Sequence, residues 1–278
     1  MKVYLDGKLV DHDKATVSIF DRGFLFSDSV YEVIQVCNNK LFLFNEHIER
    51  LHRSLKELNI PIPAVDFLQI CRNLLKDQEI VYGGIYIQVT RGRQENRSHF
   101  WYGQNIKPFV VAFVQASPPN LYKNLKVITY PDLRWQRCDI KSNSLLANVL
   151  AREEAAVRAS DEALLINESG FINEGSSTNV YMIKQNKVIT PPLRENILPG
   201  VTRKFCLETL ISMGITCEES TLTKQELLTA DEIWLSSSTK DVLPVEELDG
   251  SKINFNRDKS LWLKLHENFQ KRKIDFLI

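Results

Sequence analysis

The sequence lacks an excess of charge of either sign. Its 278 residues include 35 Lys and Arg against 35 Asp and Glu, so the formal net charge at pH 7 is zero. Proteins that bind nucleic acid or anionic membranes usually carry an excess of positive charge, and we expect neither partner here. The chain also lacks the run of ~20 apolar residues that a membrane-spanning helix requires. Its first residues, MKVYLDGKLV, do not resemble a secretory signal, so we expect a cytoplasmic protein.

Cysteines are few, odd in number and far apart in the chain. No pair shows the C-x-x-C spacing of a zinc or iron–sulfur site, so no metal site is predicted. A reducing compartment is the simplest setting for such a set. The five are Cys37, Cys71, Cys138, Cys206 and Cys217.

What is present is an ordinary globular composition, with 44% hydrophobic and 25% charged residues. In the first half, VYLDGKLV places Asp6-Gly7 between two alternating apolar runs, which predicts a β-hairpin. NEHIERLHRSLKEL shows helical apolar spacing, and Asn45 is the expected N-cap. A second helix is predicted over 65–76, and strands are predicted before and after it. This half therefore has an α+β pattern.

The second half again contains strands and helices, and a linker is predicted before it. The segment ASPPNLYKN, residues 116–124, contains two consecutive prolines that cannot continue a helix or a central strand. We therefore predict an N-terminal α+β domain over 1–118 and a C-terminal domain over 119–278. The C-terminal domain should contain a helix over 144–158, two successive hairpins, and a helix that begins after Pro199-Gly200.

Four features of the second half could carry chemistry. They are Lys141, the segment NEGSSTN around Glu174, the helix start PGVTR, and the hydroxyl-rich SSST at the end of a strand. A helix N-terminus binds anions through its free amides, and a lysine amine can form an imine with a carbonyl. Together they suggest a ligand with a phosphate, a carbonyl and a ring that needs an acidic partner, and pyridoxal 5'-phosphate (PLP) fits. Read singly, Lys141 could be a surface lysine and Glu174 a surface turn residue.

Ordered blocks along nearly the whole chain resemble the class IV aminotransferase family. The blocks are SIFDRGFLFSDSVYE, NEHIERL, RCDIKSNSLLANVLA, NEGSSTNVY, ILPGVTR and ELDG. The family includes D-amino acid transaminases, branched-chain aminotransferases and aminodeoxychorismate lyases. The resemblance implies a two-domain, α+β, fold-type IV PLP enzyme built as a homodimer.

The resemblance also assigns roles to residues. Lys141 corresponds to the catalytic Schiff-base lysine, and Glu174 to the partner of the pyridine nitrogen. Phosphate contacts are implied for Arg50 on the N-terminal helix and for Val201 and Thr202 at the helix start. The remaining implied residues contact phosphate or substrate in the hydroxyl-rich turn: Ser237, Ser238 and Thr239. A simpler interpretation of Arg50 is a solvated residue paired with Glu46 at i, i+4.

The segment around Arg97 and His99 bears on the choice of substrate. It resembles the Arg-x-His loop of D-amino acid transaminases, which reaches the neighbouring subunit's active site and, with a tyrosine matching Tyr31, binds the substrate α-carboxylate. A guanidinium fork suits a carboxylate, although a charged loop can also bind nothing. One departure from the family pattern is that Ser27 and Ser29 stand where glycines are usual, which could restrict φ and shift Tyr31.

The sequence therefore predicts a transaminase that moves an amino group between a D-amino acid and a 2-oxo acid. Three alternatives remain at this point. An aminodeoxychorismate lyase would use the same lysine but release pyruvate, a branched-chain aminotransferase would act on branched-chain amino acids, and a PLP-binding protein would turn nothing over.

Overall fold

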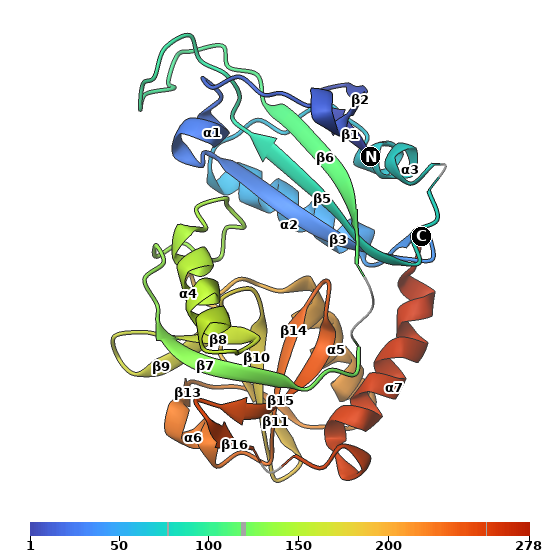
Figure 1. The fold of residues 1–278 in the computed structure, drawn as a ribbon, viewed down its shortest axis with the longest axis vertical. Coiled ribbons are helices and arrows are strands. Elements are labelled where there is room, and N and C mark those ends of the chain that lie inside the picture. The colour runs from blue at the N-terminus through green and yellow to red at the C-terminus, as the bar shows by residue number, and fades with distance from the viewer. Residues whose placement is uncertain (77, 118–120, 254) are drawn as a thin grey trace. The chain divides into compact units, whose positions relative to one another are not determined.

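The computed structural model describes residues 1–76, 78–117, 121–253 and 255–278, and the chain forms two compact units. The first comprises Met1–Pro119, Ile140–Ser144 and Phe276–Ile278; the second comprises Asn120–Asp139 and Leu145–Asp275. Each unit combines helices with a sheet (Figure 1), so the α+β expectation is confirmed. The predicted domain boundary at 118/119 lies outside the described residues. The short segment that carries Lys141 groups with the first unit although its neighbours on both sides belong to the second.

The first unit is built on a six-stranded sheet in the order β2-β1-β6-β5-β3-β4. Its strands are β1 (Lys2–Leu5), β2 (Lys8–Asp11), β3 (Ser29–Cys37), β4 (Lys40–Leu41), β5 (Tyr82–Thr90) and β6 (Phe109–Ala116). Its helices are α1 (Arg22–Phe26), α2 (Phe44–Glu57) and α3 (Phe67–Leu75), with a 3-10 turn at His12–Lys14. The predicted hairpin at Asp6-Gly7 is present as the antiparallel pair β1–β2.

One apolar core holds these elements together. The side chains that α2 places against the sheet include Leu51 and Leu55, which are fully buried beside Ile34 of β3 and Ile85 of β5. Helix α2 follows the length of β3 (Figure 1). Burial of apolar surface on this scale is the main stabilising term in a domain, and it fixes which face of α2 points inward.

The segment Ile140–Ser144 is attached to the start of β3 by main-chain hydrogen bonds. The amide of Tyr31 donates to the Lys141 carbonyl over 2.9 Å, and the amide of Asn143 donates to the Ser29 carbonyl over 3.1 Å. Ile140, 4% exposed, packs in the core of the first unit. These contacts attach the main chain around Lys141 to the first unit, so its position does not depend on an unsupported loop.

The second unit contains a ten-stranded sheet whose main path is β12-β11-β10-β14-β15-β7-β8-β9-β13, with β16 paired to β15. The strands are β7 (Leu125–Pro131), β8 (Glu162–Ile166), β9 (Phe171–Gly175), β10 (Asn179–Lys184), β11 (Lys187–Thr190), β12 (Cys217–Glu219), β13 (Leu222–Thr223), β14 (Glu232–Ser237), β15 (Asp241–Leu248) and β16 (Ser251–Lys252). The helices are α4 (Leu146–Val157), α5 (Val201–Ser212), α6 (Lys224–Leu228) and α7 (Leu261–Lys273), with 3-10 turns at Arg257–Lys259 and Ile274–Phe276. Both predicted hairpins are present, as β8–β9 and β10–β11.

Two helices of the second unit start or stop where the sequence predicts. The capping box of Thr223 and Glu226 begins α6, and Gly214, with φ of +76°, follows the end of α5. Gly214 accepts this left-handed conformation without the steric cost that a Cβ atom adds.

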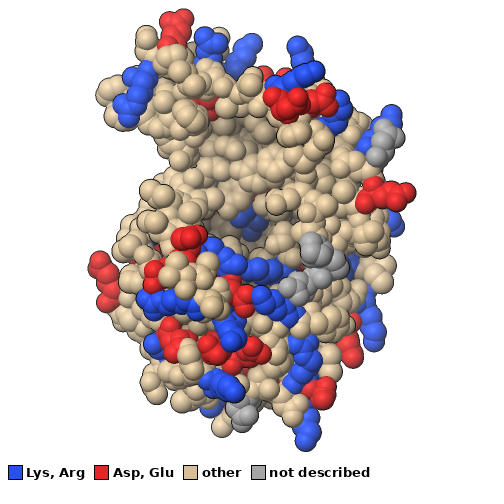
Figure 2. All heavy atoms as spheres, viewed as in Figure 1, with Lys and Arg blue, Asp and Glu red and all other residues tan. Residues whose placement is uncertain are grey.

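Lys and Arg side chains lie interspersed with Asp and Glu over the second unit (Figure 2), in keeping with the balanced composition.

Two other helix starts differ from the prediction. Leu43 rather than Asn45 is the N-cap of α2, and no side chain caps that helix. The reason is packing, because Leu43 and Phe44 are both buried and determine where the chain turns. Helix α4 begins at Leu146 rather than Ser144, since Asn143 bonds to Ser29 and Tyr86 instead of capping a helix. None of the helices in the described part of the chain combines the length and apolar character needed to cross a bilayer.

Candidate active site

Lys141 presents its amine to the face of a tyrosine in the first unit. Its Nζ atom lies 4.2 Å from the centroid of the Tyr31 ring, and its main-chain amide donates to Ser54 Oγ over 3.3 Å. Within the described ranges, no carboxylate lies within ion-pair distance of this amine. A half-buried lysine held by its main chain but without an anionic partner is suited to bond covalently with a carbonyl.

Arg50 belongs to a buried cluster on the inner side of α2. Its Nε and Nη2 atoms donate to both oxygens of Glu32 over 2.7 and 2.8 Å, and His47 Nδ1 lies 2.7 Å from the same carboxylate. Burial raises the pKa of Glu32, but Arg50 and His47 outweigh it and hold that pKa well below its ordinary value. Arg50 is therefore a fixed cation in a position set by Glu32.

Ser29 and Tyr31 link the start of β3 to the lysine segment. Ser29 Oγ donates to Asn143 Oδ1 over 2.8 Å and accepts from Gln88. The Tyr31 ring stacks on Tyr86, with centroids 5.6 Å apart, and Tyr86 receives a hydrogen bond from Asn143. These contacts limit the rotation of the ring over which the Lys141 amine lies.

Arg97 and His99 lie together in the irregular segment between β5 and β6 of the first unit, with exposed side chains. The Arg97 guanidinium carbon is 4.8 Å from the centroid of the Phe26 ring, and the His99 ring is 5.2 Å from it. The structure therefore brings the two predicted carboxylate-binding side chains to one aromatic residue of α1.

Glu174 is buried in the second unit, at the end of β9. Arg134 Nη1 donates to it over 2.5 Å, Asn179 Nδ2 over 3.1 Å, and the amide of Leu198 over 3.2 Å. Burial raises the pKa of Glu174, and the Arg134 guanidinium partly offsets that increase. The simpler interpretation of Glu174 as a surface turn residue is wrong, because the side chain is almost completely inaccessible.

The start of α5 is coupled to Glu174 through Asn179. Gly200 is the N-cap of α5, and a Cβ atom there would lie 2.0 Å from Asn179 Oδ1. Any other residue would displace the amide that bonds to Glu174. Val201 and Thr202 have buried side chains, so it is the free main-chain amides of the first turn that can bind an anion.

Ser237, Ser238 and Thr239 form the end of β14 and the turn that follows it. Strand β14 pairs with β10, with Asn179 opposite Ser236, which brings the hydroxyl-rich turn beside the strand that follows Glu174. The hydroxyls of the other predicted turn have a different use. Ser176 and Ser177 both donate to the buried Glu162, Ser177 over 2.7 Å.

Sequence analysis missed the residues that hold the candidate side chains in place. Arg134 is separated from Glu174 by 40 positions, and no local pattern pairs them. Glu32 gave a clearer signal, since VYEVIQV places a carboxylate on the face that Val30 and Ile34 bury, and a buried charge requires a partner. No three His, Cys, Asp or Glu side chains in the described ranges come together in a way that could hold a metal ion.

Comparison with known proteins gives one consistent family. The sequence model of the amino-transferase class IV family matches residues 29–248. A D-alanine aminotransferase of Bacillus licheniformis is 39% identical over 258 residues, which cover 91% of this chain and 90% of the relative. Neither a lyase nor a non-catalytic PLP-binding protein receives support from these findings.

Solved structures with the same fold have less similar sequences. A branched-chain aminotransferase of the archaeon Thermoproteus uzoniensis superimposes with a TM-score of 0.87 at 23% identity, covering 100% of this chain and 98% of the other. A PLP-bound hypothetical aminotransferase of Mycobacterium tuberculosis gives 0.86 at 19% identity and covers 99% of each chain. These likenesses confirm the expected two-domain fold of the branched-chain and D-amino acid aminotransferases, and the family match adds the class: this chain belongs to the class IV aminotransferases.

Proposed function

We propose that this protein is a PLP-dependent transaminase that moves the amino group between a D-amino acid and a 2-oxo acid. The observation that carries the proposal is Lys141, an anchored lysine whose amine faces Tyr31 without an anionic partner among the described residues. Family membership supports transamination, and the high identity to a D-alanine aminotransferase supports D-amino acids. The branched-chain alternative has less support, because the branched-chain aminotransferases among the structural neighbours are less than 25% identical to this chain, and at that level only the fold is shown to be shared.

The residues present fit PLP in three ways. A free amine suits its aldehyde, and a buried carboxylate at Glu174 suits its ring nitrogen. The start of α5 suits its phosphate, because the N-cap Gly200 has no side chain to bond to the first amides. Lys141 would hold the cofactor covalently and Glu174 would hold the ring-nitrogen proton. Arg50, Val201, Thr202, Ser237 and Ser238 would hold the phosphate. When bound, the cofactor supplies an electron sink for the bonds at the substrate α-carbon.

The protein's own contribution is to place groups and move a proton. We propose that the amino group of the substrate would displace Lys141 from its covalent link to the cofactor, which would free the lysine amine. The freed Lys141 amine would then take the proton from the substrate α-carbon as a general base and give it back later as a general acid. Arg134 and Asn179 keep Glu174 in one orientation, so its oxygen does not have to reorganise during the reaction.

Tyr31, Arg97, His99 and Thr239 are the proposed substrate contacts. Arg97 can bond to both oxygens of an α-carboxylate, while His99 and the Tyr31 hydroxyl add single donors. Both sides of the transamination, amino acid and 2-oxo acid, carry this carboxylate. One set of donors can therefore serve both half-reactions.

We also propose a homodimer in the cytoplasm. Support for the dimer comes from Phe24, Phe100 and Tyr102 of the first unit, which are 67%, 79% and 96% exposed, because exposed aromatic groups are typical of interfaces. The five free cysteines support a reducing compartment. Sedimentation equilibrium should give twice the 32.1 kDa of one chain, and a single-chain mass at micromolar protein would contradict the dimer.

Covalent trapping tests the role of Lys141. Borohydride reduction of the PLP-loaded protein, followed by digestion and mass spectrometry, should place the tag on the peptide that contains Lys141. The variant Lys141→Ala should give no tagged peptide there and no turnover, while Lys56→Ala, at an exposed lysine of α2, should be tagged as the wild type is. A tag on another lysine of the wild type would contradict the assignment.

A further inference from the structure

The segment that carries Arg97 and His99 is irregular, yet its main chain is bonded to buried side chains. Residues 91–108 lie outside the strands that precede and follow them. Exposed irregular segments usually fluctuate more than the sheet that supports them. A pair of side chains that must bind a carboxylate in a fixed geometry loses affinity if their main chain moves, so something must hold this segment.

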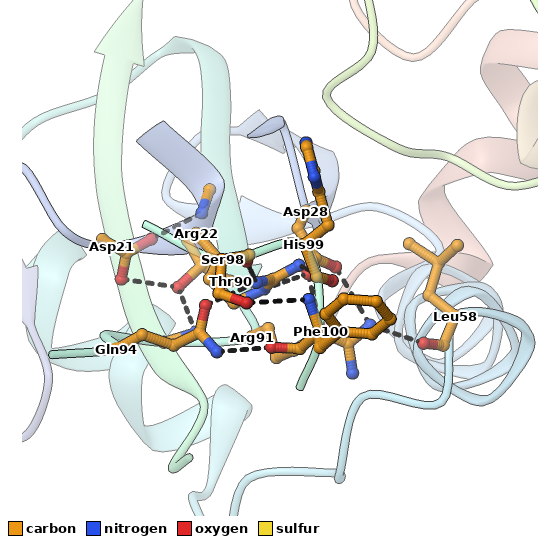
Figure 3. Close-up of polar contacts among 12 residues, drawn as sticks. Asp21, Arg22, Asp28, Leu58, Thr90, Arg91, Gln94, Ser98, His99 and Phe100 are labelled. Atoms are coloured by element: carbon orange, nitrogen blue, oxygen red, sulfur yellow. Dashed lines mark hydrogen bonds and ion pairs between the residues drawn. The ribbon is translucent and has the colours of Figure 1, made fainter. Parts of the chain in front are cut away.

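Arg22, from the first turn of α1, makes the contacts that do this. Its side chain is 4% exposed. Nη1 donates to the Ser98 carbonyl over 2.5 Å, and Nη2 donates to the His99 carbonyl over 3.3 Å. Figure 3 shows Arg22 beside Ser98 and His99, with Gln94 adjoining them. Gln94 accepts from Arg22 and donates to the next carbonyl, that of Phe100, over 2.8 Å.

Three consecutive carbonyls are thus fixed by two buried side chains. The peptide units on both sides of His99 cannot rotate without breaking these hydrogen bonds, and the same units determine the direction of the His99 side chain. Arg97 is separated from the nearer of these units by one residue, and its side chain is held by the ring of Phe26. The ring of Phe26, four residues after Arg22 on α1, lies 4.8 Å from the guanidinium carbons of both Arg22 and Arg97. One short helix therefore contacts the main chain and the side chains of the segment.

Asp28 fixes the orientation of the Arg22 guanidinium. Its Oδ2 atom accepts from Arg22 Nε and from Arg91 Nε, each over 2.7 Å. Arg91 in turn donates to the carbonyls of Leu58 and Asn59 after the end of α2. The network is visible in Figure 3: Arg91 bonds to the turn that follows α2, whereas Arg22 is the one of the two arginines that bonds to the main chain of Ser98 and His99.

We propose that Arg22 is a positioning residue for substrate recognition: it holds the main chain of Ser98 and His99 so that Arg97 and His99 can bind the α-carboxylate. The inference rests on the proposed function of Arg97 and His99 and adds the residue that makes their geometry possible. Arg22 contacts neither substrate nor cofactor in this role.

Substitution of Arg22 should separate binding from chemistry. Arg22→Met removes the donors to Ser98 and His99, and it should raise the KM for D-alanine about tenfold or more while kcat changes by less than about threefold. Arg22→Lys keeps a charge beside Asp28 but offers one compact ammonium in place of a planar guanidinium. Its KM should therefore lie between that of the wild type and that of Arg22→Met. Absorbance of bound PLP should stay as in the wild type.

Arg91→Met is the matched control. It removes the same kind of side chain from the same aspartate, but the Arg91 guanidinium donates to the carbonyls of Leu58 and Asn59 and stacks on the Trp101 ring, whereas Arg22 donates to the carbonyls of Ser98 and His99. Hydrogen exchange of the peptide 95–104 supplies a measurement that does not depend on activity. Exchange should accelerate in Arg22→Met and stay near the wild-type rate in Arg91→Met, even if both variants unfold at a lower temperature.

A double-mutant cycle decides whether Arg22 acts through the two side chains. In a background of Arg97→Met with His99→Phe, adding Arg22→Met should raise KM no further. If Arg22→Met raises KM by the same factor in that background, or if Arg91→Met raises KM equally, the inference is overturned. If Arg97→Met alone leaves KM unchanged, the proposed carboxylate site fails and the inference with it; if Arg97→Met raises KM and Arg22→Met does not, only the inference fails.

Discussion

Ser27 shows how a single residue can depart from a family pattern and what it costs. It stands where the family usually has glycine, and its φ of +55° and ψ of +24° are left-handed, after the last residue of α1. A Cβ atom in this conformation is sterically unfavourable. Ser27 thus adopts a conformation that favours glycine in spite of its Cβ atom, whereas Ser29 lies within the extended strand β3, where a serine is not restricted.

Replacing Ser27 with glycine should stabilise the protein. We expect Ser27→Gly to raise the free energy of unfolding by about 0.5–1 kcal/mol, since relief of strain in the folded chain exceeds the added entropy of glycine in the unfolded chain. Urea titration measures this difference. Ser27→Ala keeps the Cβ atom and should give no gain; equal gains in both variants would show that the backbone conformation is not the cause.

Individual candidate residues could be chosen from the sequence, but their partners could not. Lys141, Glu174 and Arg50 occupy recognisable motifs, and the structure places each of them in a defined polar environment. The side chains that orient them, such as Arg134 and Asn143, are brought near by the fold over long separations. A pattern in a short stretch of sequence contains no information on such distant pairs. Glu32 is different, because a carboxylate within an apolar strand indicates that some cationic partner must be present, although it does not say which one.

At the scale of elements, the strong local signals were correct and the weaker ones were displaced by packing. The Asp6-Gly7 hairpin and the capping box at Thr223 depend on a few adjacent residues and are present as predicted. The start of α2 depends instead on where Leu43 and Phe44 become buried. Tertiary packing outweighs the preference of Asn45 for a cap, because a cap contributes only about 1 kcal/mol.

The short helix α1 also matters more for the Arg97 segment than its length suggests. Its five residues include Arg22 and Phe26, which contact both the main chain and the side chains of the Arg97 segment. Asp21 caps the helix by accepting from the Gly23 amide over 2.7 Å, and it also accepts from Thr90 of β5. The helix is thereby tied to the sheet, and it can transmit that rigidity to an otherwise irregular segment.

At the scale of the whole molecule, the sequence predicted the class of fold but not the path of the chain. Two α+β units were expected, and two are present. The grouping of Ile140–Ser144 with the first unit was not predicted, because it follows from main-chain pairing with Ser29 and Tyr31 rather than from any property of DIKSN itself. The position of Lys141 therefore depends on residues over one hundred positions away in the sequence.

The proposed chemistry also requires that the whole chain select one substrate configuration. Lys141 can remove the α-proton only from a substrate whose carboxylate is held elsewhere, so the side chains that bind that carboxylate determine which enantiomer reacts. Arg97 and His99 supply that second point of attachment in the proposal. Selectivity between mirror-image substrates is thus a property of the assembled enzyme, and no single residue contains it.

One measurement tests this account most directly: the absorbance of the PLP-loaded protein mixed in turn with D-alanine and L-alanine, without any 2-oxo acid. The account predicts that D-alanine bleaches the yellow colour and releases one pyruvate per site, that L-alanine does so far more slowly, and that an added 2-oxo acid restores the colour. Bleaching by L-alanine at an equal or greater rate, or no change with either enantiomer, would contradict it.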